Sequence, residues 1–198
     1  MNEFKKPDLD HVVHELISKR WSPYVFDERP VGEEDLLALF EAARWAPSSY
    51  NEQPWRFIVA KREDGEEFER LLSCLVELNQ AWAKHAAVLA LGAVSLNFAR
   101  NDKPNRAAHH DLGLAAAHLT LEATARGLSV HQMTGIVPER ARELYDIPQG
   151  FEAWTALAIG YAGSPSGELG ERDRSPRSRR PIREFVFSGT FGTPYGGS

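Results

Sequence analysis

The stretch "HHDLGLAAAHLTLEATARGL", residues 109–128, gives the strongest helical signal in the chain. Alanine and leucine occur throughout it, and Gly127 is a typical stop signal just past the end of a helix. Because its apolar residues fall on nearly every side, we expect this helix to be covered all round. In one small domain such a helix is either central or faces a partner subunit.

Segments before and after this stretch alternate between helical and strand patterns. Apolar residues at helical spacing predict further helices over 9–17, 32–46, 66–79 and 138–145. Alternating or continuous runs of apolar, aromatic and β-branched residues predict strands over 55–62, 86–94, 129–132 and 152–161. The first helix would leave Arg20 and Ser22 just beyond its C-terminal end.

Residues 164–198 are rich in Gly, Pro, Ser and Arg, and only "REFVF", residues 183–187, is patterned like a strand. A segment of this length without a helix rarely packs well alone. It either frays or lies across another subunit. We therefore divide the chain into a domain over 1–163 and a C-terminal extension over 164–198.

The composition is that of a soluble globular protein, with 42% hydrophobic and 26% charged residues among 198. The longest apolar run, "AAVLALGAVSL" from Ala86, is shorter than the ~20 residues that cross a bilayer, and the N-terminus lacks the apolar core of a secretory signal. No membrane span is expected. A single cysteine, Cys74, suits a reducing cytoplasm. The formal charge of −5 gives no global attraction to nucleic acid, so any basic site must be local.

Seven histidines raise the alternative of a metal site. His109, His110 and Asp111 adjoin one another, and His11 and His14 form an H-x-x-H. However, the chain has no H-E-x-x-H and no cysteine pair that would complete a zinc site. Solvated or helix-capping histidines are the better account, and no metal is expected.

Common nucleophile and phosphate motifs are absent from the sequence. The "GSPSG" at 163–167 has proline where a nucleophile elbow needs serine, and there is no G-x-G-x-x-G and no phosphate loop. A bound phosphate would therefore need side-chain charge. Six arginines in "ERDRSPRSRRPIRE", residues 171–184, supply it, since arginine holds phosphate bidentately. No aromatic residues are interleaved with them, so a solvated segment remains an alternative and a nucleic-acid site is not favoured.

Three polar stretches lie at the ends of predicted elements. They are "KRWSP" at 19–23, "APSSYNEQPW" at 46–55 and "HQMTGIV" at 131–137. The second carries more hydrogen-bonding side chains than a helix-to-strand link of ~2–6 residues requires. In the third, Gly135 lets backbone amides approach a ligand closely. With the tail arginines, these stretches offer a phosphate cradle and partners for a flat polar ring, which suits flavin mononucleotide (FMN).

The same stretches resemble, in order, the motifs of the nitroreductase family of FMN-dependent oxidoreductases. "RWS" at 20–22 is similar to the R-R-S start of the family, and "APSSYNEQPWRF" at 46–57 to its A-P-S-S-x-N-x-Q-P-W signature. The helix at 109–128, "IPQGFEAWTALAIGYAG" at 147–163 and the basic "RSRRPIREFVF" at 177–187 resemble later family motifs. Each motif alone is loose, but five in the right order are hard to obtain by chance.

The resemblance implies an α+β fold with a central, mostly antiparallel sheet flanked by helices. It also implies an intertwined homodimer with two FMN sites at the subunit interface. Residues 1–163 would then form the FMN-binding domain, and the extension would pack on the partner subunit. Both the apolar long helix and the unplaced tail agree with such a dimer.

The resemblance also assigns the cofactor-binding residues, in three groups. The ribityl phosphate would be held by Arg20, Ser22, Arg177 and Arg179, and Trp21 between the first two is assigned to the cofactor with them. The isoalloxazine ring would be lined by Pro47, Ser48, Ser49 and Asn51 of the other subunit. The N5 and O4 edge of the ring would meet the backbone of Met133, Thr134 and Gly135.

The activity implied is a two-step exchange. NAD(P)H reduces FMN and leaves, and a nitroaromatic, quinone or other small electrophile then accepts the electrons at the same face. No side chain here carries a hydride, so the redox chemistry belongs to the flavin and no residue is assigned a catalytic role.

Two residues depart from the family pattern. Tyr24 stands where the family often has a second arginine, so the phosphate would depend more on the tail. Thr134 stands where many members carry an acidic residue, which leaves the acceptor open. Members of the fold that cleave flavin or remove halogens share these motifs and are alternatives, as is a non-catalytic flavin-binding redox module.

Overall fold

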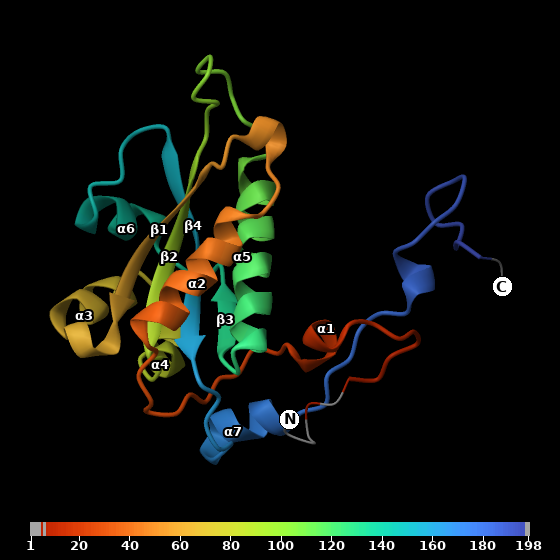
Figure 1. Ribbon diagram of the computed structural model, residues 1–198, viewed down its shortest axis with the longest axis horizontal. Coiled ribbons are helices and arrows are strands. Elements are labelled where there is room, and N and C mark those ends of the chain that lie inside the picture. Colours follow the sequence, from red (N-terminus) through yellow and green to blue (C-terminus); the bar gives the residue numbers. More distant parts are fainter. Residues whose placement is uncertain (1–4, 6, 197–198) are drawn as a thin grey trace.

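The computed structural model describes residue 5 and residues 7–196. Within them one sheet is formed by β1 Trp55–Lys61, β2 Val88–Ser95, β3 Ser129–Met133 and β4 Phe151–Gly160. Around it lie α1 Glu15–Lys19, α2 Glu33–Arg44, α3 Glu66–Leu72, α4 Glu77–Ala83, α5 Ala108–Ala125, α6 Pro138–Leu144 and α7 Gly167–Arg174 (Figure 1). The four predicted strands and the helices predicted over 32–46, 109–128 and 138–145 are confirmed.

The strand order is β1-β2-β4-β3, and every pair of neighbours is antiparallel. β1 and β3 are therefore the two edge strands, while β2 and β4 lie in the middle. The expected α+β class with a mostly antiparallel central sheet is confirmed.

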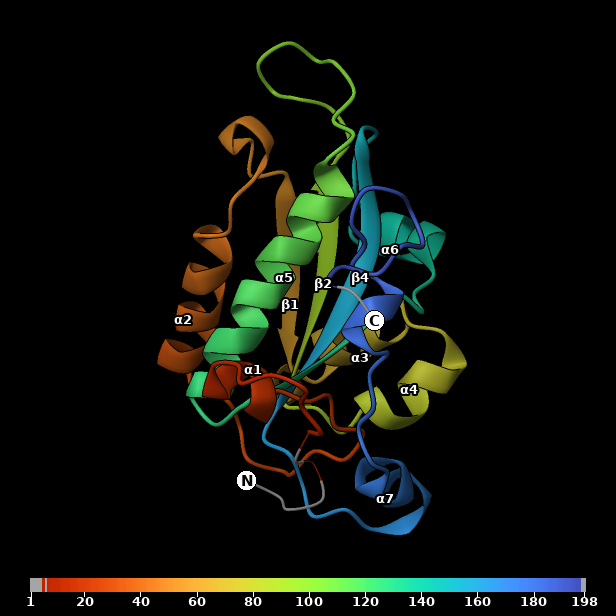
Figure 2. The same cartoon turned by 90° about the vertical axis from the view of Figure 1, so that its right-hand side faces the viewer.

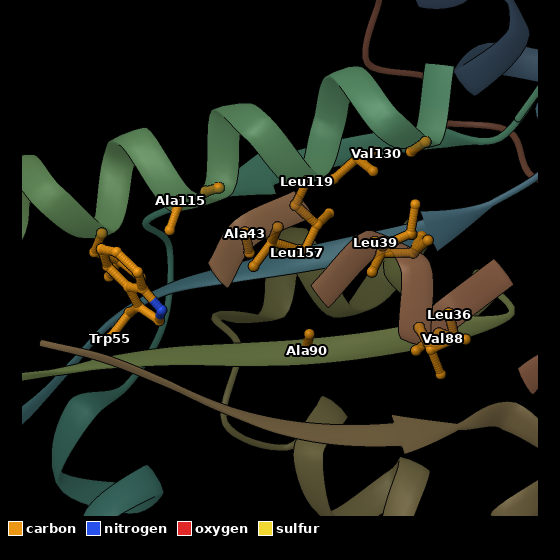
Figure 3. Close-up of a cluster of buried hydrophobic side chains, with 14 of the residues drawn as sticks. Leu36, Leu39, Ala43, Trp55, Val88, Ala90, Ala115, Leu119, Val130 and Leu157 are labelled. Carbon is orange, nitrogen blue, oxygen red and sulfur yellow. The ribbon is translucent and has the colours of Figure 1, made fainter. Parts of the chain in front are cut away.

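Helices cover both faces of the sheet. Helices α2 and α5 lie on one face, and α3, α4 and α6 lie on the other (Figures 1 and 2). A hydrophobic core lies on each face. Figure 3 shows the core between the sheet and helices α2 and α5, where Leu39 of α2, Ala90 of β2 and Leu119 of α5 are all 0% exposed. Each fully buried leucine contributes about 1.5–3 kcal/mol, so α5 and the central strands form a rigid frame.

Gly92 of β2 allows α5 to approach the sheet closely. A Cβ atom at this position would lie 2.8 Å from Cγ2 of Thr155 and 3.3 Å from Cδ1 of Leu112. The first distance is shorter than real Cβ contacts, so only glycine fits without a shift of its neighbours.

Helix α5 is covered on two sides but not all round. Ala115, Ala116 and Leu119 are buried against α2 and the sheet, whereas Gly113 and Ala117 are exposed. The complete cover expected from the sequence is not provided by this chain alone. A partner subunit on the exposed side remains a prediction.

The helix predicted over 9–17 is wrong in its first half. Helix α1 begins only at Glu15, after His14, whose Nδ1 accepts a hydrogen bond from the backbone N–H of Leu16 at 3.2 Å. Leu9 and Val12 precede it and are exposed. Short helices need tertiary packing to form. Residues 9–13 are all exposed, so their apolar side chains lack the packing that would stabilise a helix.

The helix predicted over 66–79 is also wrong, because it is divided into α3 and α4. Between them the chain pairs with the segment after β3: Leu75 bridges Ile136, and the N–H of Val137 donates to the carbonyl of Cys74 at 2.7 Å. These long-range hydrogen bonds replace the helical ones, and a local pattern does not reveal them.

The extension contains a helix that the sequence did not predict. Helix α7 forms in it because Asp173, 3% exposed, accepts hydrogen bonds from the N–H groups of Tyr24 and Val25. The strand expected over 183–187 is wrong: a 3-10 turn spans Ile182–Glu184, and Phe187 makes only an isolated bridge to Pro194. After α7 the chain passes beside α1, where Arg177 contacts Ser18, and then extends away from the sheet (Figure 1).

Two findings bear on the class of protein. None of the helices in the described part of the chain has the length and apolarity needed to cross a bilayer. Across residue 5 and residues 7–196, no group of three or more His, Cys, Asp or Glu is arranged to hold a metal ion. His109 instead lies with Nε2 2.9 Å from Oε2 of Glu152.

Candidate functional site

The segment after α1, residues 20–25, passes over the outer edge of β3, and this segment is called the crossing. Arg20 and Ser22 lie on the α5 side, where they line a cavity together with Gln132 of β3. Tyr24 lies on the other side, where its ring packs edge-on against Trp82 of α4 with centroids 5.2 Å apart. The crossing thus places two predicted phosphate-binding residues beside β3.

Two side chains from distant parts of the sequence fix this crossing. His131 of β3 places Nδ1 2.8 Å from the carbonyl oxygen of Pro23. Asp173 of α7 accepts hydrogen bonds from the N–H groups of Tyr24 and Val25 at 2.9 Å. Burial lowers the pKa of His131, and the hydrogen bond to Pro23 and the charge of Asp173 oppose this shift only in part.

Three arginines meet at the crossing, in a cavity that Asp8 also lines. Arg177 donates from Nη1 to the carbonyl of Arg20 and from Nη2 to that of Ser18, both at 2.6 Å. Burial and the nearby guanidinium of Arg179 lower the pKa of Arg20, and burial, Arg20 and Arg179 lower the pKa of Arg177. Among the described residues no carboxylate forms an ion pair with any of the three. Their mutual repulsion favours binding of an anion here.

One buried polar atom at this cluster lacks a partner. Within the described residues, Nε of Arg177 is buried and makes no hydrogen bond. A buried donor left unpaired costs about 1–3 kcal/mol, so an anionic ligand that reaches it would gain stability.

Arg20 lies between two cavities. The one toward α5 has a volume of about 320 Å³ and is lined by Ile17, Arg20, Ser22, Ala117, Thr120, Leu121, Val130 and Gln132. The one toward the tail, about 180 Å³, is lined by Arg20, Arg177 and Arg179 together with Pro7, Asp8, Leu9, Ile17, Ser18 and Ser178. Guanidinium groups therefore stand at one end of a space whose other walls are largely apolar.

Gln132 and Thr120 are site residues that the sequence analysis missed. Nε2 of Gln132 donates to Oγ1 of Thr120 at 2.8 Å and to the carbonyl of Ala116 at 3.2 Å. This leaves Oε1 of Gln132 as an acceptor beside the cavity. A polar residue inside a short strand was a usable signal for Gln132, but its partnership with Thr120 depends on packing.

Trp21 does not share the cavity of Arg20 and Ser22. It lines a separate depression with Thr124 and Gly127 at the C-terminal end of α5, and its ring centroid is 5.3 Å from Nζ of Lys5. Its assignment to the cofactor stays a prediction.

Residues 133–135 continue from Gln132 along the same edge of the sheet. Met133 is buried, and its carbonyl accepts a hydrogen bond from Oγ1 of Thr155 at 3.0 Å, whereas Thr134 is exposed. A Cβ at Gly135 would lie 2.4 Å from Nδ2 of Asn79. A larger residue here would displace the Asn79 side chain from its packing position on α4, whatever the role of Gly135 toward a ligand.

The loop with Pro47, Ser48, Ser49 and Asn51 lies elsewhere, at the N-terminal end of α5 (Figure 2). The N–H of Ser49 donates to Oδ2 of the buried Asp111 at 3.0 Å, and Oγ of Ser48 accepts from the N–H of Gln53. Tyr50, Asn51 and Gln53 have positive φ angles of 55°, 56° and 49°. Backbone strain of this kind is found more frequently at binding sites than elsewhere.

Part of this loop is structural and part is free. Ser48 closes the turn, whereas the hydroxyl of Ser49 and the side-chain amide of Asn51 make no hydrogen bond within the described residues. From the sequence, Asp111 was considered only as a possible metal ligand. Its role as the anchor of the loop was missed because its partner, Ser49, lies 62 positions away.

The loop and the arginines are not brought together in one chain. The loop leads into β1, whereas residues 133–135 follow β3, so the width of the sheet, about 14 Å, separates them. Along α5, Asp111 and Thr120 lie nine residues apart, which is again about 14 Å. A ligand that contacts all three groups must therefore either span these distances or lie between two copies of the chain.

Comparison with known proteins identifies the family. The nitroreductase family model matches residues 17–161, which include the crossing, the loop and α5. The chain belongs to the nitroreductase family. The arginines of the tail lie outside the matched residues.

Similar structures and relatives agree with this membership. The crystal structure of an oxidoreductase containing FMN has a TM-score of 0.89 and 35% sequence identity, over 98% of this chain and 100% of that one. A nitroreductase family protein from Clostridium difficile 630 has a TM-score of 0.71 and 25% identity, over 89% of this chain and 98% of that one. The major NAD(P)H-flavin oxidoreductase of Aliivibrio fischeri is 26% identical over 88% of this chain and 97% of its own. The nitroreductase fold expected from the motifs is confirmed.

Proposed function

We propose that this protein is an FMN-dependent oxidoreductase that takes a hydride from NAD(P)H and reduces a nitroaromatic, a quinone or a related small electrophile. The observation that carries the proposal is the cluster of Arg20, Arg177 and Arg179, in which no arginine forms an ion pair with a described carboxylate and Arg20 also lines the largely apolar cavity toward α5. The names of the FMN-containing and NAD(P)H-flavin oxidoreductases that it resembles support the same reading.

The residues present fit FMN group by group. The three guanidinium groups suit its phosphate, and the unpaired Nε of Arg177 suits an oxygen acceptor. Ser22 and Gln132 offer polar contacts to a polyol chain. The free groups of Ser49 and Asn51, on the loop, suit the polar perimeter of a flat ring.

When bound, FMN supplies the redox chemistry, since it accepts a hydride from NAD(P)H and passes electrons to an acceptor. The residues of this chain bind and orient. Arg20 and Arg179 hold negative charge at one end of the site, and the exposed Thr134 places a neutral side chain near the predicted ring edge. No residue is proposed as a proton donor.

The proposal includes a homodimer in which each site is shared. The loop of one chain and the arginines of the other would enclose one cofactor between them. The exposed side of α5 with Gly113 and Ala117 offers a close-packing surface. The tail carries Ile182, Phe185, Phe191 and Tyr195 exposed, and packing them on the partner would bury them.

An absorbance spectrum of the purified protein tests the proposal. Oxidised flavin bands that bleach on addition of NAD(P)H and return with a nitroaromatic or quinone are expected. Arg20→Ala and Arg179→Ala should each weaken FMN binding by about tenfold, since a charge-assisted hydrogen bond contributes about 1.5–3 kcal/mol. A protein that stays colourless after incubation with excess FMN would overturn the proposal.

A further inference from the structure

His131 lies beside the cavity without lining it. Its Nδ1 is 2.8 Å from the carbonyl oxygen of Pro23, and its ring packs against Tyr24 and Trp82 with centroids 4.8 and 4.3 Å away. Because a carbonyl oxygen only accepts, Nδ1 is the donor. The imidazole is thus held in one orientation by a hydrogen bond and by two aromatic rings.

This hydrogen bond fixes the point at which the chain crosses the edge of β3. Pro23 follows Ser22 directly. Because proline has no backbone N–H, its carbonyl oxygen is the backbone group through which it can be held by a hydrogen bond. Gln132, the neighbour of His131, faces the cavity that Arg20 and Ser22 line. Together with the hydrogen bonds that Asp173 accepts from Tyr24 and Val25, this contact holds Ser22 on the crossing segment beside Gln132 on the strand.

We propose that His131 is a positioning residue for the phosphate end of the site: through Pro23 it holds Arg20 and Ser22 in register with Gln132. The inference rests on the proposed binding of FMN. His131 does not contact the ligand, and its side chain lies on the side of β3 where Trp82 packs. Its effect is therefore confined to the part of the ligand that Arg20 and Ser22 reach.

Riboflavin provides the readout, because it is FMN without the phosphate. Dissociation constants of both ligands are measured on the full-length protein by quenching of flavin fluorescence. The parent should bind FMN more tightly than riboflavin. His131→Phe keeps a ring against Trp82 but removes the donor, so it should lower the preference for FMN roughly tenfold and change riboflavin binding less than about twofold.

His131→Asn is the rescue variant. The amide nitrogen of asparagine reaches the position of Nδ1, so the hydrogen bond to Pro23 is kept and the preference for FMN should return to within about twofold of the parent. If His131→Phe fails to fold, His131→Gln takes its place. The amide of glutamine reaches the position of Nε2 and not that of Nδ1, so the hydrogen bond to the carbonyl of Pro23 is lost in this variant as well. A folded His131→Asn that lacks the preference would overturn the proposal.

A matched control lies at the other end of α5. His109 also has a polar partner, Glu152 at 2.9 Å, and a tryptophan ring, Trp154, at 4.2 Å. His109→Phe should leave the ratio of the two affinities unchanged. Equal losses of FMN and riboflavin binding in His131→Phe would show a purely structural role. A parent that binds neither flavin would instead refute the proposed function.

Discussion

The carboxylate of Asp173 accepts a hydrogen bond from the backbone N–H of Tyr24, a residue 149 positions earlier in the chain. Tyr24 follows the segment with Arg20 and Ser22, and Asp173 precedes Arg177 and Arg179 by a few residues. One buried side chain therefore joins the two parts of the sequence that supply the arginine cluster. It is also the reason why the extension forms a helix where the sequence indicated none.

Replacing Asp173 by alanine should destabilise the fold and weaken FMN binding together. The N–H groups of Tyr24 and Val25 would lose their acceptor, and each buried donor left unpaired costs about 1–3 kcal/mol. Urea unfolding measures the first effect and FMN titration the second. Glu171→Ala, an exposed change in the same helix, is the control and should alter neither.

Acidification should destabilise the folded protein through His131. Burial holds the pKa of this imidazole below its usual 6.5, so the unfolded chain binds the proton more readily. The contribution is complete above pH 6.5 and is lost as the pH falls from there through the lowered folded-state pKa. Urea unfolding of the parent and of His131→Asn over this range measures it, and equal slopes in the two proteins would contradict the assignment.

Gly135→Ala should destabilise α4 against β3. The new Cβ would lie 2.4 Å from Nδ2 of Asn79, which donates to the carbonyl of Gly135, and 3.0 Å from Cγ2 of Val76. Crowding of this kind costs about 1–3 kcal/mol. In an Asn79→Ala background the same change should cost less, because the nearest atom is gone. Thermal unfolding of the four proteins gives the coupling, and additive effects would argue against the clash.

Asp111→Ala should affect the loop before β1 and not the arginine cluster. Without the acceptor at Oδ2, the N–H of Ser49 is unpaired and residues 47–51 lose their anchor to α5. If this loop contacts the ring, the affinities for FMN and riboflavin should fall by the same factor. His110→Ala, an exposed neighbour, should change neither affinity.

Local patterns were sufficient for the frame of the fold. Strand β2 follows from a run whose apolar residues are all buried, and α5 from a run that is buried on the side facing α2 and the sheet. Failures came where a distant partner decides the backbone: the break between α3 and α4 depends on residues 135–137, and α7 depends on Tyr24 and Val25.

The candidate site shows the same division. Arg20, Ser22, Arg177 and Arg179 were predicted and lie together around two adjoining cavities. Gln132 and the anchor Asp111 were missed as site residues, because the role of each is set by a neighbour on another element. Trp21 was also predicted from a motif, but it lies in a different depression from Arg20.

The distance between the loop and the arginines has a genetic consequence. If each site draws its loop from one chain and its arginines from the other, two variants that are each defective alone can complement one another in a mixed dimer. A mixed dimer of an Arg20→Ala chain and an Asn51→Ala chain would contain one site with both lesions and one with neither. Co-expression of the two variants should therefore restore activity that neither has alone, and a single chain with both changes should not.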